Sequence, residues 1–142
     1  MAINGTYSAT LNTPQTNGEK LTLTQSDAAG NISPTVPLTA PDTTAPVAPT
    51  AAVSANGGSG TGTGEAGATI TVRAADGTIL GTATVAANGS YTAALVPAQL
   101  NGERLSVSQA DGAGNGSPNT AVTAPDHTPP VAPTAAVSST GT

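Results

Sequence analysis

The stretch ATITVRAADGTILGTATVAANGSYTAAL at residues 68–95 decides the fold, because its apolar side chains recur at every second position. In its first seven residues, Ile70 and Val72 alternate with polar residues, and RLSVSQA at 104–110 repeats the pattern. A period of two is that of a β-strand with one face buried and the other in water. Both stretches are therefore predicted to be antiparallel strands.

Turn-forming residues separate these strands from others of the same kind. Asp76-Gly77, Asn88-Gly89 and the loop at 111–115 have the composition of tight turns, and no segment of ten residues shows a helical period. The expected strands are 49–54, 68–74, 78–85, 90–96, 104–110 and 117–124. Short strands at this spacing predict an all-β fold, an immunoglobulin-like β-sandwich. We expect the core to form where Ile70, Val72, Leu105 and Val107 face one another across the two sheets. Tyr91 and Leu95 are expected to close the same core.

The chain is a tandem repeat with a period of 84 residues. Residues 4–58 align with 88–142 without a gap, and 32 of these 55 pairs are identical. Each repeat is long enough to be a small domain. The Pro-rich linker APDTTAPVAPT is stiff because Pro fixes its own φ and favours extended geometry in the residue before it. We therefore expect the C-terminal part of a preceding repeat at 1–42, a complete repeat at 43–126, and the linker and first strand of a further repeat at 127–142.

Composition excludes several classes of protein. The chain has 3 Lys+Arg against 8 Asp+Glu, so the phosphate backbone of a nucleic acid would be repelled. No run of about 20 apolar residues is present that would cross a bilayer. The absence of Cys excludes disulfides and thiol nucleophiles. The glycines at 62, 64 and 67 match a dinucleotide-binding motif, but a strand and not a helix follows them.

Four motifs occur in order along the chain: G-E-x-G at 64–67, D-G-T at 76–78, D-x-A-G-N at 111–115 and P-D-x-T-x-P at 125–130. In these motifs and their order, the chain resembles the bacterial immunoglobulin-like repeats of giant biofilm-associated surface adhesins, most closely those of the Acinetobacter Bap type. The resemblance implies an extracellular, non-enzymatic stalk module at the bacterial cell surface, which serves adhesion between cells and to surfaces. It also implies calcium at the junctions between modules.

The acidic residues fall at turns, strand starts and linkers. In an immunoglobulin-like topology, the loops that carry Asp76 and Asp111 are expected at the N-terminal end of the module, beside Asp42 in the linker. Three carboxylates with carbonyls and waters provide the six to eight oxygens that calcium takes. Three other acids are weaker candidates: Asp126, Asp27 and Glu65. Glu65 is expected near the opposite end of the module. The competing interpretation is that these acids only form turns.

Two other functions remain as alternatives to a stalk. A ligand-binding module for a glycan or a host protein requires exposed aromatic residues, and only Tyr7 and Tyr91 are present. A carbohydrate-active enzyme requires paired carboxylates in one cleft. The expected partners are neighbouring repeats and, through unpaired strand edges in the incomplete repeats, other copies of the chain.

Overall fold

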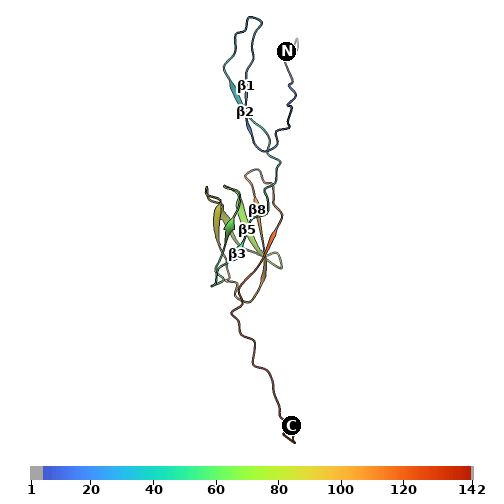
Figure 1. Cartoon of the computed structure of the whole chain (residues 1–142), viewed down its shortest axis with the longest axis vertical. Helices are drawn as coiled ribbons and strands as arrows, with labels where there is room; N and C mark the ends of the chain where they lie inside the picture. The colour runs from blue at the N-terminus through green and yellow to red at the C-terminus, as the bar shows by residue number, and fades with distance from the viewer. Residues whose placement is uncertain (1–4, 142) are drawn as a thin grey trace.

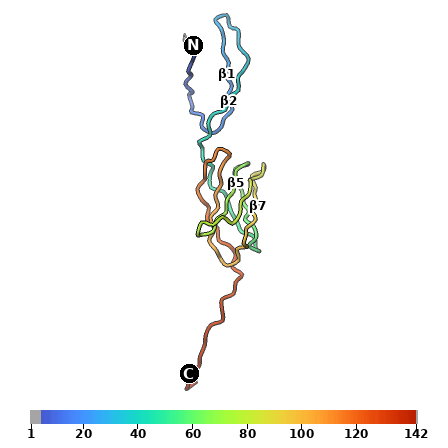
Figure 2. The backbone as a smooth tube through the Cα atoms, turned by 180° about the vertical axis from the view of Figure 1, so that it is seen from behind, coloured from blue at the N-terminus to red at the C-terminus, as the bar shows by residue number. Residues whose placement is uncertain are grey.

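A computed structural model describes residues 5–141, and its main body is a β-sandwich. Figure 1 shows a β-hairpin beyond one end of this sandwich and an extended C-terminal segment beyond the other. Figure 2 shows the same linear order from behind, with the two termini at opposite ends of the molecule. No helix within residues 5–141 is long and apolar enough to cross a membrane.

The sandwich consists of two antiparallel sheets. One has the strand order β3-β4-β7, with β3 at Ala52–Val53, β4 at Ser59–Thr63 and β7 at Ser90–Ala94. The other has the order β6-β5-β8-β9, with β5 at Thr69–Ala74, β6 at Ile79–Thr84, β8 at Arg104–Ala110 and β9 at Thr120–Thr123. The prediction of an all-β, immunoglobulin-like sandwich is confirmed.

Strand β4 is the element that the alternation of apolar residues does not reveal. Its sequence SGTGT presents glycines where other strands present apolar side chains. Glycine is required at Gly62 because a Cβ there would clash with the carbonyl oxygen of Thr50 and lie 2.9 Å from the Tyr91 hydroxyl. In the dinucleotide-like motif, Gly62 and Gly64 therefore serve close packing, and Gly67 adopts a positive φ of 85°. With β4 in place, β5 is the third strand of the sandwich and not the second.

The core lies between the two sheets and is made of small and medium side chains. Ile70 is fully buried, and Val72 and Val107 are nearly so. The prediction that Ile70 and Val72 face Leu105 and Val107 across the sheets is wrong, because β5 pairs directly with β8 in one sheet. The opposite face of the core comes from β7 and the residue that follows it. The ten buried residues of the cluster are Ala68, Ile70, Val72, Leu80, Val85, Tyr91, Ala93, Leu95, Leu105 and Val107.

The N-terminal segment repeats only part of this architecture. Its hairpin pairs β1 at Lys20–Leu23 with β2 at Val36–Thr39, which correspond to β8 and β9 one period later. Several large apolar residues of the segment stay exposed: Tyr7 is 59% exposed, whereas its counterpart Tyr91 is 5% exposed. The apolar face of this hairpin therefore has no second sheet over it within residues 5–141.

Candidate functional site

The linker that joins the hairpin to the sandwich begins with a residue bound on both sides. Asp42 forms an isolated β-bridge with Asn17, and the neighbouring Thr43 N–H donates to the carbonyl oxygen of Thr16 at 2.7 Å. The Gly18 N–H also donates to the Pro41 carbonyl at 3.2 Å. These contacts hold the start of the linker on the repeat that precedes it.

The complete module holds Asp42 from the other side through Asn115. The side-chain amide of Asn115 donates to the backbone carbonyl of Asp42 at 3.1 Å and lies 3.4 Å from its carboxylate oxygen Oδ1. The same amide donates to Asp111 Oδ2 at 2.8 Å. One amide group therefore connects a carboxylate of the module with a residue of the linker.

The loop after β8 fixes Asn115 in the position that this contact requires. The Asp111 carboxylate accepts the backbone N–H of Ala113 at 3.0 Å and that of Asn115 at 2.9 Å. The side-chain hydrogen bond from Asn115 is the largest cause of the lowered pKa of Asp111, which lies below its usual value of 3.8. Burial opposes this shift, and the backbone donors add to it. The ionised form of Asp111 is thus the one that organises the loop.

The rest of the linker is anchored along the edge of the module. The nearly fully buried Gln109 donates from Nε2 to the carbonyl oxygen of Val47 at 2.7 Å, while its Oε1 accepts the Glu65 N–H at 2.9 Å. The Tyr91 hydroxyl donates to the Thr50 carbonyl at 2.6 Å, and burial raises the pKa of this Tyr above its ordinary value of 10.0. The Thr120 hydroxyl donates to the Pro49 carbonyl. Three side chains of the module therefore bind three carbonyls of the linker.

The structure brings together only two of the three carboxylates predicted to meet at the junction. Asp111 directly follows Ala110, which pairs with Thr69 at the start of β5. Asp76 follows the other end of β5, where Ala74 pairs with Leu105, so the prediction that Asp76 joins Asp42 is wrong. The cause is β4, which reverses the direction of β5 and so places the loop after β5 at the opposite end of the sandwich. Asp76 Oδ1 accepts the Thr78 N–H at 2.9 Å, and this bond is the largest cause of its lowered pKa.

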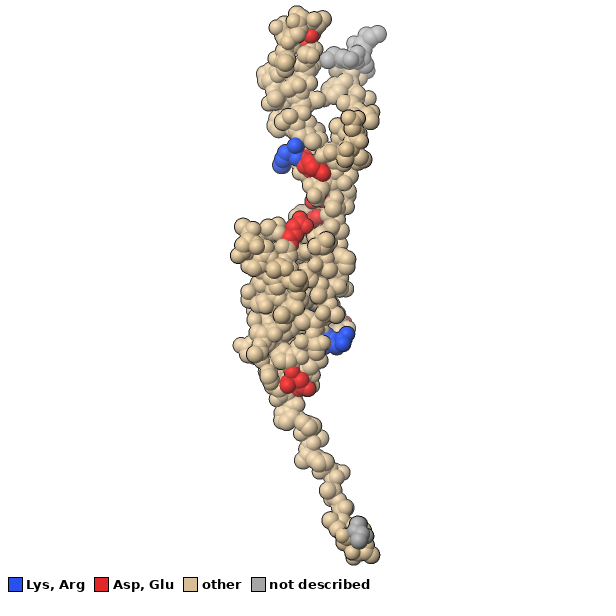
Figure 3. All heavy atoms as spheres, viewed as in Figure 1, with Lys and Arg blue, Asp and Glu red and all other residues tan. Residues whose placement is uncertain are grey.

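The weaker candidates lie at three different places. Glu65 lies at the same end as Asp111, because its N–H binds Gln109 on β8, so the expectation that it lies near the opposite end is wrong. Asp126 repeats the position of Asp42 at the other end of the module, where it bridges Asn101. Asp27 forms the same turn as Asp111 in the N-terminal hairpin, with Asn31 as its partner. Figure 3 shows acidic side chains where the hairpin meets the sandwich and again at the far end of the sandwich.

The junction offers oxygen atoms of the kind that calcium binds. Asp42 and Asp111 supply carboxylates and the Asp42 backbone supplies a carbonyl oxygen, whereas the Asn115 side chain presents its amide N–H₂ group to them. Within residues 5–141, no three His, Cys, Asp or Glu side chains form a group that would hold a metal. The junction thus has one carboxylate fewer than predicted, and calcium binding stays a prediction.

Sequence reasoning missed Asn115 and Gln109 as functional residues. Both recur one period earlier, as Asn31 and Gln25. Gln109 also occupies an inward position of β8, in register with Ile70, where alternation predicts an apolar residue. A polar residue at a buried position needs partners, and this was the available signal.

Fold and site together define an immunoglobulin-like module in tandem, with its linker bound as part of the module. The family model described as bacterial Ig domain matches residues 1–42 and 45–126. The chain therefore belongs to the bacterial immunoglobulin-like domain family, as the sequence motifs predicted. No curated protein matches the sequence significantly.

One solved structure supports the same fold. A structure titled "Biofilm associated protein - BSP domain" is 22% identical with a TM-score of 0.53, and the match covers 80% of this chain and 20% of that one. A second, titled "Structure of Protease", is 18% identical with a TM-score of 0.45 and covers 59% of this chain and 19% of that one. The chain thus spans about a fifth of the length of the solved structures that it matches.

Proposed function

We propose that this chain is a stalk segment of a bacterial surface adhesin, in which each module is a spacer and each linker a stiff joint. The role is mechanical and non-enzymatic, outside the cell, in adhesion between cells and to surfaces. Membership of the bacterial immunoglobulin-like domain family and the fold shared with a biofilm-associated protein support this proposal.

The observation that carries the proposal is the double attachment of the linker. Asp42 and Thr43 are bound to the preceding repeat, and Asn115 binds the same Asp42 from the following module. A joint in which adjacent residues are held by different modules has little freedom to bend. Pro46 and Pro49 add stiffness, because each fixes its own φ. Force applied along the chain would be carried through these contacts.

Calcium at the junction forms part of the proposal. Asp42 and Asp111 would hold the ion, whose charge would offset the repulsion between the two carboxylates. The Asn115 amide, whose N–H₂ group faces both acids, would have to turn over to offer its oxygen as a further ligand. Glu65 lies at the same end of the module and is a further candidate. Asp76 has no part in it, because it lies at the other end of β5.

The alternative of a ligand-binding module lacks a supporting observation. The one aromatic side chain of the complete module, Tyr91, is buried, and its hydroxyl is bound to the Thr50 carbonyl. The aromatic residue thus fills core volume and anchors the linker.

Distance measurements between two spin labels test the stiffness of the joint. Because the chain has no Cys, Thr22→Cys on β1 and Thr82→Cys on β6 would introduce two exposed and unique attachment sites. We expect a narrow distance distribution, which broadens when Asn115→Ala is added. The matched control is Asn31→Ala, which removes the equivalent amide from the hairpin and should leave the distribution narrow. A distribution that is broad before any substitution would refute the stiff joint.

A further inference from the structure

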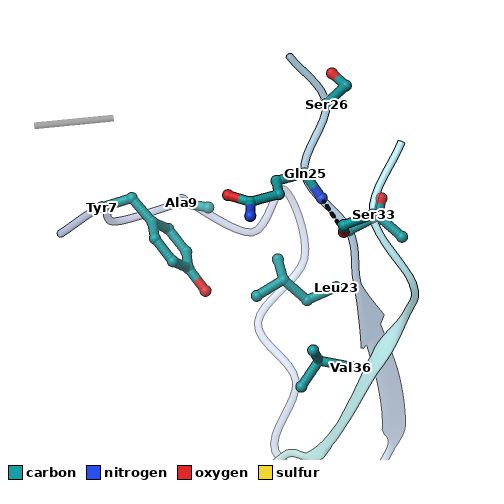
Figure 4. Close-up of a pocket in the computed structure, with 8 residues that line it drawn as sticks. Tyr7, Ala9, Leu23, Gln25, Ser26, Ser33 and Val36 are labelled. Carbon is teal, nitrogen blue, oxygen red and sulfur yellow. Dashed lines mark hydrogen bonds between the residues drawn. The ribbon is translucent and has the colours of Figure 1, made fainter. Parts of the chain in front are cut away.

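The N-terminal hairpin carries an open apolar groove. A cavity of about 510 Å³ lies between the segment around Tyr7 and the end of the hairpin, lined by Tyr7, Ala9, Leu23, Thr24, Gln25, Ser26, Ser33 and Val36. Figure 4 shows Tyr7, Leu23 and Val36 around this space, with the side chain of Gln25 directed toward Ala9. The Gln25 backbone is bound to the Ser33 hydroxyl. Its side-chain amide makes no hydrogen bond to another residue within 5–141.

The complete module shows what occupies the equivalent groove. Tyr7 and Gln25 correspond, one period later, to Tyr91 and Gln109. Those two side chains bind the linker, through the carbonyl oxygens of Thr50 at 2.6 Å and of Val47 at 2.7 Å. The occupant there is the extended peptide VAPTAAVS at 47–54, whose Val53 packs against the core.

The same peptide occurs again, without any change, at residues 131–138. Figure 1 shows this C-terminal segment extended away from the sandwich, and Val131 and Val137 are 91% and 80% exposed. We propose that residues 131–138 of a second copy of this chain bind the groove formed by Tyr7, Gln25, Leu23 and Val36. In this complex, Gln25 would donate to the carbonyl of Val131 and Tyr7 to that of Thr134.

The intermolecular contact has fewer hydrogen bonds than its template. Val36 stands where the module has Thr120, so the bond to the Pro49 carbonyl has no equivalent. The bond from the Thr50 N–H to the Thr63 carbonyl on β4 has none either, because no strand equivalent to β4 lies beside this hairpin within residues 5–141. Association should therefore be weak. Since donor and acceptor lie at opposite ends of the chain, it should also extend head to tail instead of closing into a dimer.

Sedimentation equilibrium of the full chain over a range of concentrations tests the proposal. We expect the average mass to rise above 13.4 kDa with concentration. Gln25→Ala in the acceptor and Val137→Asp in the donor should each weaken association about tenfold, the equivalent of about 1.4 kcal/mol. The matched control is Val131→Asp, because its counterpart Val47 stays 80% exposed in the bound linker, so this change should leave association intact.

A synthetic peptide VAPTAAVS added in excess should return the chain to a monomer, whereas a peptide of scrambled sequence should not. A mass of 13.4 kDa at every concentration would overturn the proposal. Association that persists unchanged in both Gln25→Ala and Val137→Asp would also overturn it, because another surface would then be responsible. Neither result would affect the proposed stalk function, which rests on the linker within one chain.

Discussion

Replacing Gln109 by Met should detach the linker from the module while keeping the volume of the buried side chain. The substitution removes two hydrogen bonds, to the Val47 carbonyl at 2.7 Å and from the Glu65 N–H at 2.9 Å. At about 1 kcal/mol for each bond, the free energy of unfolding should fall by about 2 kcal/mol. For a domain of this size, 1 kcal/mol corresponds to about 4–8 °C, so the melting temperature should fall by about 8–16 °C.

The assay is urea and thermal unfolding followed by far-ultraviolet circular dichroism, at a concentration where the chain is monomeric. The chain provides its own control in Gln25→Met, the same substitution one period earlier, where the amide has no partner within residues 5–141. This control should lower the free energy of unfolding by less than about 0.5 kcal/mol, as surface substitutions do. Equal effects of the two substitutions would show that Gln109 does not anchor the linker.

Four further outcomes are expected. Val72→Asp should prevent the module from folding, since it places a charge at a position that is 1% exposed. A cooperative melting transition close to that of the unmodified chain would contradict the assignment of Val72 to the core. Gly62→Ala should destabilise the module by more than about 1 kcal/mol in urea unfolding, because its Cβ would meet the Thr50 carbonyl, and a neutral effect would contradict the packing of β4. The lowered pKa of Asp111 means that its stabilising effect is present above about pH 4 and is lost as the pH falls through the pKa of the folded state. The difference in stability between the unmodified chain and Asp111→Asn should thus shrink as the pH falls below about 4, and a constant difference would contradict this. Millimolar calcium should raise the melting temperature, with the increase lost in Asp111→Asn and kept in Asp76→Asn, and an increase that persists in Asp111→Asn would place the ion elsewhere.

The alternation of apolar and polar residues predicted most of the strands, because each of those strands buries one face. It did not predict β4, since Gly60 and Gly62 bury backbone against neighbours and leave no apolar side chain to count. The missing strand reverses the expected direction of the strand that follows it, β5. Asp76 was therefore assigned to the wrong end of the sandwich, although its turn was predicted correctly.

The pairing of Asp42 with Asp111 was predictable for a different reason. Both acids recur with the period of the repeat, and an immunoglobulin-like topology places the loop that carries Asp111 beside the preceding linker. The partner that joins them, Asn115, was not predicted, because a Gly-Asn pair in a turn indicates only turn geometry. Long-range contacts such as Asn115 to Asp42 depend on the tertiary fold.

Amide hydrogen exchange measured by NMR tests the attachment of the linker most directly, because the peptide VAPTAAVS is present twice in one chain. The Thr50 N–H is bound to the Thr63 carbonyl at 3.0 Å in the complete module, whereas its counterpart Thr134 lies in the extended C-terminal segment. In a dilute, monomeric sample, Thr50 should exchange as slowly as the core amides of β5, and Thr134 at a rate close to that of an unstructured peptide. Equally fast exchange at Thr50 and Thr134 would show that the linker is not part of the folded module, and would contradict the account of a stiff joint.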